Sequence, residues 1–97
     1  MPNGYLAEYT EGAVHAQYRY DAKGNRLFCI LTYTQKEMPQ DVRRLVRSTY
    51  YDYTIGWVKE IHEADVTCYL VHVEDSTAWK DLVVRDGEMT VWHEFNK

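Results

Sequence analysis

Histidines and cysteines are the side chains of this sequence best suited to bind a metal or to attack a substrate. Zinc sites use them at short, fixed spacings, and no HExxH motif or paired CxxC motif occurs. Non-adjacent strands could bring His72 and His93 together, but solvated histidines on strands are the simpler interpretation of both positions. We therefore expect no metal and no cofactor. The four histidines are His15, His62, His72 and His93.

The two cysteines, Cys29 and Cys68, lie inside apolar runs. A nucleophilic cysteine needs a neighbouring base and an acid that orients that base, and apolar surroundings disfavour the thiolate. We therefore expect a protein that is not an enzyme. A disulfide would require Cα atoms within about 7 Å of each other, which the sequence leaves open. The apolar surroundings favour buried free thiols.

The remaining charged groups have ordinary structural explanations. Arg43, Arg44 and Arg47 are expected on the solvated face of a helix. The acidic residues gather near expected turns, where they serve turn geometry and solubility. The two acidic groups are Glu60, Glu63 and Asp65, and Asp81, Asp86 and Glu88.

Size and composition exclude several classes of protein. The 97 residues predict a single domain spanning 1–97. A formal charge of -4 argues against nucleic-acid binding, which needs a basic surface. No run of eighteen apolar residues is present, so we expect no membrane insertion. The first residues, Met1–Gly4, lack the pattern of a signal peptide.

One segment has a clear helical period. Residues 38–50 place apolar side chains at i, i+3, i+4, i+7 and i+8, which forms one stripe along a helix. Pro39 suits the first helical position, since it has no N–H to leave unbonded. The stripe consists of Val42, Leu45, Val46, Thr49 and Tyr50.

The rest of the sequence predicts strands joined by short turns. The Asp86-Gly87 dipeptide is the strongest hairpin signal. The apolar run at 27–31 indicates a central strand covered on both faces. We predict an α+β fold, a single helix packed on a curved antiparallel β-sheet in the order β-β-β-α-β-β-β-β. The alternative is two separate layers of three and four strands. The expected strands are 5–10, 13–20, 26–34, 55–63, 66–74, 78–85 and 89–95.

Strand alternation predicts an apolar surface on the side of the sheet away from the helix. Exposed patches of this kind mark partner surfaces. We expect an unidentified protein or peptide partner there, and the alternative is a homodimer in which the same face is buried. The candidate binding residues are Trp57, Leu70, His72, Val83 and Trp92.

The helix and the strands after it resemble the PepSY-like domains, a family of β-lactamase-inhibitor-like proteins. The resemblance covers about residues 13–90, and Tyr20-Asp21-x-x-Gly24 is similar to the family motif that ends a sheet unit. Met38 stands where the family usually has leucine. The residues that carry the resemblance are Met38-Pro39, Val42, Val46, Tyr50, Tyr53, Ile55, Val58, Tyr69-x-Val71-x-Val73, Leu82-x-Val84 and Asp86-Gly87.

This resemblance implies a helix over a curved antiparallel sheet and a periplasmic or secreted location. It carries over no catalytic residues, because none is assigned in the family. We therefore expect a non-enzymatic binding module, and inhibition of its partner is one role that such a module can have. The alternative is a structural or homo-oligomerising domain.

Overall fold

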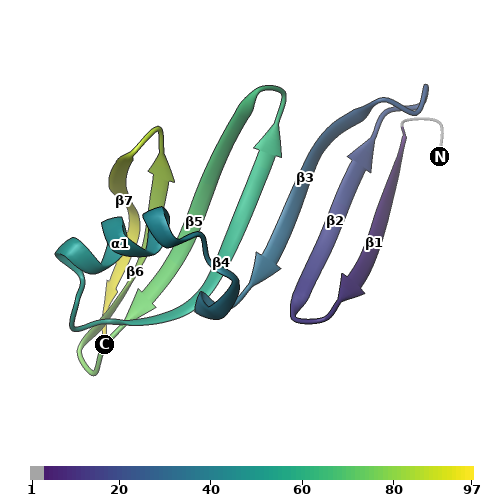
Figure 1. Cartoon of the computed structure of the whole chain (residues 1–97). Helices are drawn as coiled ribbons and strands as arrows, with labels where there is room; N and C mark the ends of the chain where they lie inside the picture. Colours follow the sequence, from purple (N-terminus) through teal and green to yellow (C-terminus); the bar gives the residue numbers. More distant parts are fainter. Residues whose placement is uncertain (1–3) are drawn as a thin grey trace.

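The computed structural model describes residues 4–97 as one seven-stranded antiparallel sheet with a single α-helix on one face (Figure 1). The strands lie in the sheet in the same order as in the chain, and the sheet is open. This confirms the predicted fold and excludes two separate layers. The strands are β1 (Tyr5–Glu11), β2 (Val14–Tyr20), β3 (Arg26–Tyr33), β4 (Thr54–Glu63), β5 (Val66–Glu74), β6 (Ala78–Arg85) and β7 (Glu88–Asn96).

Tight turns explain why consecutive strands pair. β1 and β2 are joined by Gly12 and Ala13, and Gly12 supplies the positive φ of +58° that this two-residue connection needs. β6 and β7 are joined by Asp86 and Gly87, both with positive φ, as in a type I′ turn. The predicted Asp86-Gly87 hairpin is therefore confirmed.

The helix α1 (Gln40–Thr49) follows a short 3₁₀ turn, η1 (Gln35–Glu37), after β3. Pro39 is the N-cap of α1, with an extended ψ of 140°, and does not occupy the first helical position as expected. Val42 and Val46 are buried, whereas Thr49 is exposed. Leu45 and Tyr50 pack against the core but are only half-buried, so the fully buried stripe is narrower than predicted.

The hydrophobic core lies between α1 and the part of the sheet formed by β4, β5 and β6. In Figure 1 the helix lies over this end of the sheet, and β1 to β3 extend beyond it. The molecule is correspondingly elongated, measuring 46 × 25 × 25 Å. The buried core residues are Tyr33, Met38, Val42, Val46, Ile55, Val58, Val71, Val73, Leu82 and Val84.

One expectation about how the sheet is covered is wrong. The apolar run at 27–31 is not covered on both faces: Cys29 is buried, but Leu27 is 46% exposed. A single helix of ten residues is too short to cover seven strands. Cys29 and Cys68 are both free thiols, as expected, although Cys68 is only half-buried.

Arg43 and Arg47 do not lie on a solvated face. The guanidinium of Arg47 donates to the carbonyl of Tyr53 at 2.8 Å and to the side chain of Gln35 at 3.2 Å. Arg43 donates to the main-chain carbonyl of Gln35. These two arginines join the helix to the turns before and after it, while Arg44 is exposed.

Within residues 4–97, no helix is long and apolar enough to cross a lipid bilayer.

Candidate functional site

The face of the sheet opposite the helix, called here the open face, is formed by alternate residues of each strand. Side chains in a strand point to opposite faces in turn, so the residues beside the buried Val58, Val71 and Leu82 point away from the core. The strand register places Trp57 beside His72, and His72 beside Asp81. His93 of β7 pairs with Asp81 on its other side.

Four rings from four neighbouring strands lie side by side across the open face, two pairs of them stacked and the middle pair tilted by 39°. The ring centroids of Trp57 and His72 are 5.1 Å apart, and those of His72 and Trp79 are 5.5 Å apart. Trp79 stacks in turn on Phe95 at 5.6 Å. We call Trp57, His72, Trp79 and Phe95 the aromatic row. Three of these rings are half-buried and Phe95 is 55% exposed, so the row forms a continuous aromatic surface that is partly open to solvent.

A buried carboxylate holds the centre of the aromatic row. Asp81 is 9% exposed, and its Oδ1 accepts a hydrogen bond from Nδ1 of His72 at 2.7 Å. Its Oδ2 lies 3.8 Å from Nδ1 of His93. A buried carboxylate is stable only when it is paired, and here two imidazoles supply the partners. Asp81 therefore fixes the orientation of the His72 ring.

Two smaller features complete this arrangement. Gly56 lies against the His72 ring, and a Cβ atom at that position would lie only 3.0 Å from Cδ2 of His72. The ammonium group of Lys59 lies 5.6 Å from the centroid of the Trp57 ring. The glycine makes room for the imidazole, and the lysine adds a positive charge at one end of the row.

The predicted binding residues fall on this surface in three groups. Trp57 and His72 are in direct contact and belong to the aromatic row. Leu70 and Val83 lie opposite each other on β5 and β6, two residues along the strands from the pair of His72 and Asp81. Both are half-buried. Trp92 lies at a β-bulge, where it is 57% exposed and stacks on His93 with centroids 4.2 Å apart.

Sequence reasoning missed Asp81, Trp79 and Phe95. It assigned Asp81 to a group of turn carboxylates, which is wrong, because Asp81 lies in the middle of β6. The signal was present in the alternation: Trp79, Asp81 and Val83 are two residues apart and therefore share a face. Phe95 could not be aligned with them in the same way, because the bulge beside Trp92 shifts the register of β7.

The pairing of His72 with Asp81 also resembles the way hydrolases orient a general base. In such enzymes the other imidazole nitrogen faces a hydroxyl or thiol. Here Nε2 of His72 lies 3.8 Å from a carboxylate oxygen of Glu74. In the described part of the chain, no group of three or more histidine, cysteine or acidic side chains is placed to hold a metal ion.

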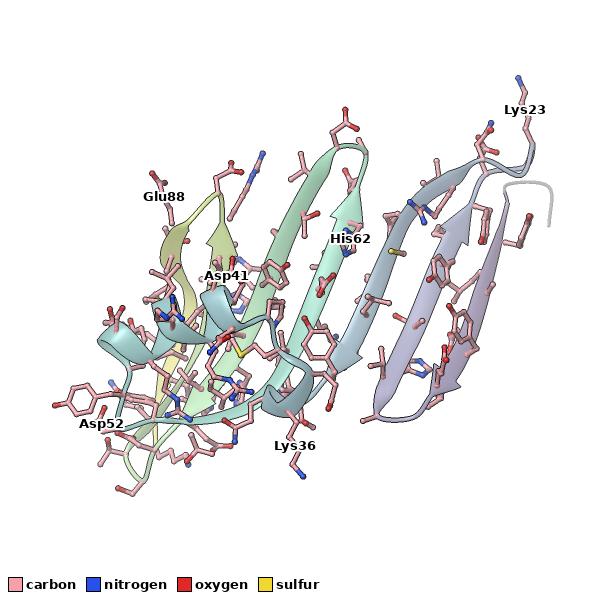
Figure 2. The ribbon with its side chains drawn as sticks, viewed as in Figure 1. Lys23, Lys36, Asp41, Asp52, His62 and Glu88 are labelled. Atoms are coloured by element: carbon pink, nitrogen blue, oxygen red, sulfur yellow. The ribbon has the colours of Figure 1, made fainter. Side chains whose placement is uncertain are left out.

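A polar cluster lies on the helix side of the sheet, on the part of β4 that α1 does not cover (Figure 2). The hydroxyl of Tyr33 donates to Glu60 at 2.7 Å, and Glu60 is also 2.5 Å from Nε2 of His62. Burial and the contact with Glu60 raise the pKa of Tyr33 far above its usual value. Glu60 is therefore a mid-strand hydrogen-bond acceptor and not a turn carboxylate as expected.

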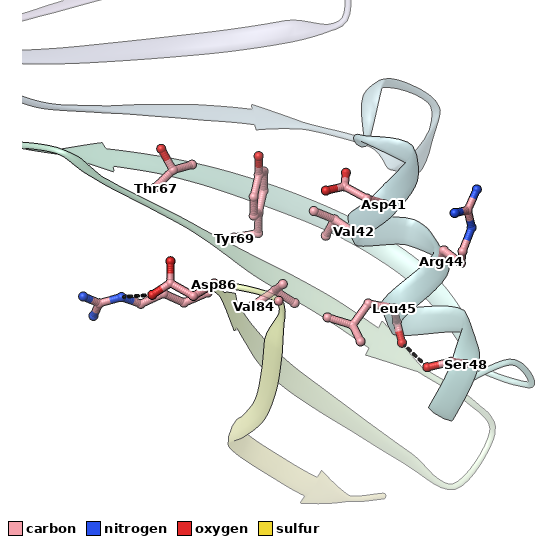
Figure 3. Close-up of a pocket in the computed structure, with 11 residues that line it drawn as sticks. Asp41, Val42, Arg44, Leu45, Ser48, Thr67, Tyr69, Val84 and Asp86 are labelled. Carbon is pink, nitrogen blue, oxygen red and sulfur yellow. Dashed lines mark hydrogen bonds and ion pairs between the residues drawn. The ribbon is translucent and has the colours of Figure 1, made fainter.

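A cavity of about 590 Å³ lies between the outer edge of α1 and the ends of β5 and β6. Figure 3 shows Val42 and Leu45 of the helix on one side of it and Tyr69 and Val84 of the sheet on the other. Its rim carries both charges, since Asp41, Arg44, Arg85 and Asp86 also line it. The mixed rim favours no particular charge in a ligand.

Neither a protein-family model nor a curated protein sequence matches this chain. Two solved structures share its fold. One is a DUF2874 family protein from Bacteroides uniformis, with a TM-score of 0.70 and 12% identity over 97% of this chain and 71% of that chain. The other is a BLIP-like protein from Bacteroides fragilis, with a TM-score of 0.64 and 18% identity over 98% of this chain and 77% of that chain. At these identities the likeness shows the fold alone, a BLIP-like fold.

Proposed function

We propose that this protein is a non-enzymatic binding module that grips a protein or peptide partner with its open face. The observation that carries the proposal is the aromatic row supported by the buried Asp81. Aromatic side chains that are held rigid contribute large contact areas at low entropic cost, and they dominate the binding energy of protein interfaces. Lys59 and Glu74 beside the row would provide polar contacts at its rim.

Several further points belong to the same proposal. The likeness to a BLIP-like protein supports a role in protein binding, with inhibition of a partner enzyme as one form of it. Membership of the PepSY-like family and a periplasmic or secreted location follow from the sequence resemblance. The location is tested by fractionating cells of the source organism and probing each fraction with an antibody.

The binding proposal is tested with two surface variants of the full chain. The wild-type protein is used to capture a partner from the envelope fraction of the source organism, and the affinity of the purified partner is measured by calorimetry. Trp79→Ala removes the ring that joins His72 to Phe95, so we expect at least a tenfold loss of affinity, or more than about 1.4 kcal/mol.

Tyr51→Ala is the control, because Tyr51 is 76% exposed and lies in the turn that follows α1. It should leave the affinity unchanged. Equal affinities for the wild type and Trp79→Ala, with both variants folded by circular dichroism, would remove the open face as the binding site. Hydrolysis of a chromogenic cephalosporin by a panel of β-lactamases, with and without the protein, tests the inhibitory form separately.

A further inference from the structure

The two edges of the sheet differ in how well they are protected from pairing with another strand. Natural edge strands are blunted by bulges, prolines or charged side chains. β7 carries a bulge beside Trp92, which interrupts a regular outer edge. β1 pairs with β2 over seven consecutive residues without a register shift, contains no proline, and carries Glu8 and Glu11 as its only charged side chains. Its outer edge is therefore regular, and within residues 4–97 no other strand pairs with it.

The backbone groups that β1 presents outward can be identified from its hairpin. Glu11 and Val14 flank a two-residue turn and so form a hydrogen-bonded pair, and such pairs alternate along an antiparallel ladder. The N–H and C=O groups of Leu6, Glu8 and Thr10 therefore point away from β2. They can accept another antiparallel strand.

Large apolar side chains accompany this free edge on both faces. Tyr5 is 49% exposed, Tyr9 is 50% exposed and Leu6 is 46% exposed. Each tyrosine already stacks inward on β2: Tyr5 on Tyr20 with centroids 4.8 Å apart, and Tyr9 on Tyr18 at 5.6 Å. The outward sides of Tyr5 and Tyr9 have no ring against them in the described chain.

We infer that the outer edge of β1 pairs antiparallel with β1 of a second copy of this chain, with Ala7 opposite Ala7 on the two-fold axis. This register places Tyr5 opposite Tyr9 of the other copy and Leu6 opposite Glu8. It bonds the outward groups of Leu6 and Glu8 to each other, as the hydrogen-bonding pattern requires. It also joins the tyrosine stacks into two continuous rows of four rings across the interface.

The neighbouring registers are less favourable. A shift toward the C-terminal end of β1 would oppose Glu8 with Glu8, and like charges directly opposite each other destabilise a sheet. A shift the other way would leave Tyr9 without a ring opposite it. In this register the edge of β1 is complementary to itself, and for this reason we infer a second copy of the chain as the strand that pairs with it. A single strand pair buries less area than an obligate interface, so we expect dissociation in the micromolar range.

Sedimentation of the full chain across micromolar concentrations tests the pairing. We expect the wild type to form dimers and Glu8→Pro to stay monomeric with an unchanged far-ultraviolet spectrum. Proline at position 8 removes an N–H that points outward and costs no bond to β2. Glu8→Ala keeps the N–H and should still dimerise. A wild-type monomer throughout, or a Glu8→Pro dimer, overturns the inference.

A cysteine placed on the two-fold axis tests the register. Directly opposed residues of a non-hydrogen-bonded pair are close enough for a disulfide, so oxidised Ala7→Cys should become a covalent dimer. Glu11→Cys should not, because the register separates the two Glu11 positions by roughly 26 Å. Wild type, with its free Cys29 and Cys68, gives the background. Crosslinking of Glu11→Cys but not of Ala7→Cys contradicts the register.

Because the aromatic row lies on β4 to β7, Glu8→Pro should leave partner binding unchanged.

Discussion

At the scale of single residues, the carboxylate of Asp81 is the group on which the open face depends most. It is nearly buried and lies between the imidazoles of His72 and His93. Asp81→Asn keeps the shape of the side chain but removes the charge-assisted hydrogen bond. We expect the free energy of unfolding to fall by about 1–3 kcal/mol, measured by urea denaturation near neutral pH.

The matched control for that change is Asp86→Asn, in the turn between β6 and β7. The side chain of Asp86 is 89% exposed, and its φ of 54° is one that asparagine adopts readily. The control should change stability by no more than about 0.5 kcal/mol. If both variants lost the same free energy of unfolding, the pairing of Asp81 with the two histidines would not be a source of the protein's stability.

At the scale of secondary-structure elements, Arg47 fixes the end of α1 to the sheet. Its guanidinium reaches the carbonyl of Tyr53, just before β4, and the side chain of Gln35 in η1. Arg47→Ala should lower the free energy of unfolding by about 1.5–3 kcal/mol, the range for hydrogen bonds made by a charged group. Arg44→Ala, on the exposed side of the same helix, should have almost no effect in the same urea titration. A large loss in Arg44→Ala would contradict this assignment.

The same elements show what the sequence predicts well and what it does not. Periodicity located α1 and all seven strands within one or two residues, because burial against one core imposes a regular spacing. Strand alternation also placed Trp57 and His72 on one face. The pairing of His72 with Asp81 depends on which residues lie opposite each other across β5 and β6. That register is regular along β5 and β6, and the turn between the two strands sets it. The contacts of Trp57 and of β7 with this pair also depend on two bulges, one between β4 and β5 and one between β6 and β7, and neither has a recognisable local pattern in this chain.

At the scale of the whole molecule, tyrosines make folding sensitive to alkaline pH. Burial first, and then the hydrogen bond to Glu60, raise the pKa of Tyr33. Burial also raises the pKa of Tyr69, and a hydrogen bond with Tyr9 raises that of Tyr18. In the unfolded chain each phenol ionises near pH 10. Above that pH the unfolded state has lost protons that the folded state still holds, so stability must fall as pH rises.

Among the tyrosines, Tyr33 should contribute most to this loss of stability at alkaline pH, because it is buried in the core and bonded to Glu60. We expect the free energy of unfolding to be constant from about pH 8 to the unfolded pKa near 10 and to fall steadily above it. Tyr33→Phe should be less stable than wild type near neutral pH, because Glu60 loses a donor, yet should lose less stability on going to about pH 11. Tyr51→Phe, at an exposed position, should follow the wild-type curve. Urea titrations at each pH measure all three, and parallel curves for wild type and Tyr33→Phe would show that the Tyr33 phenol is not the group responsible.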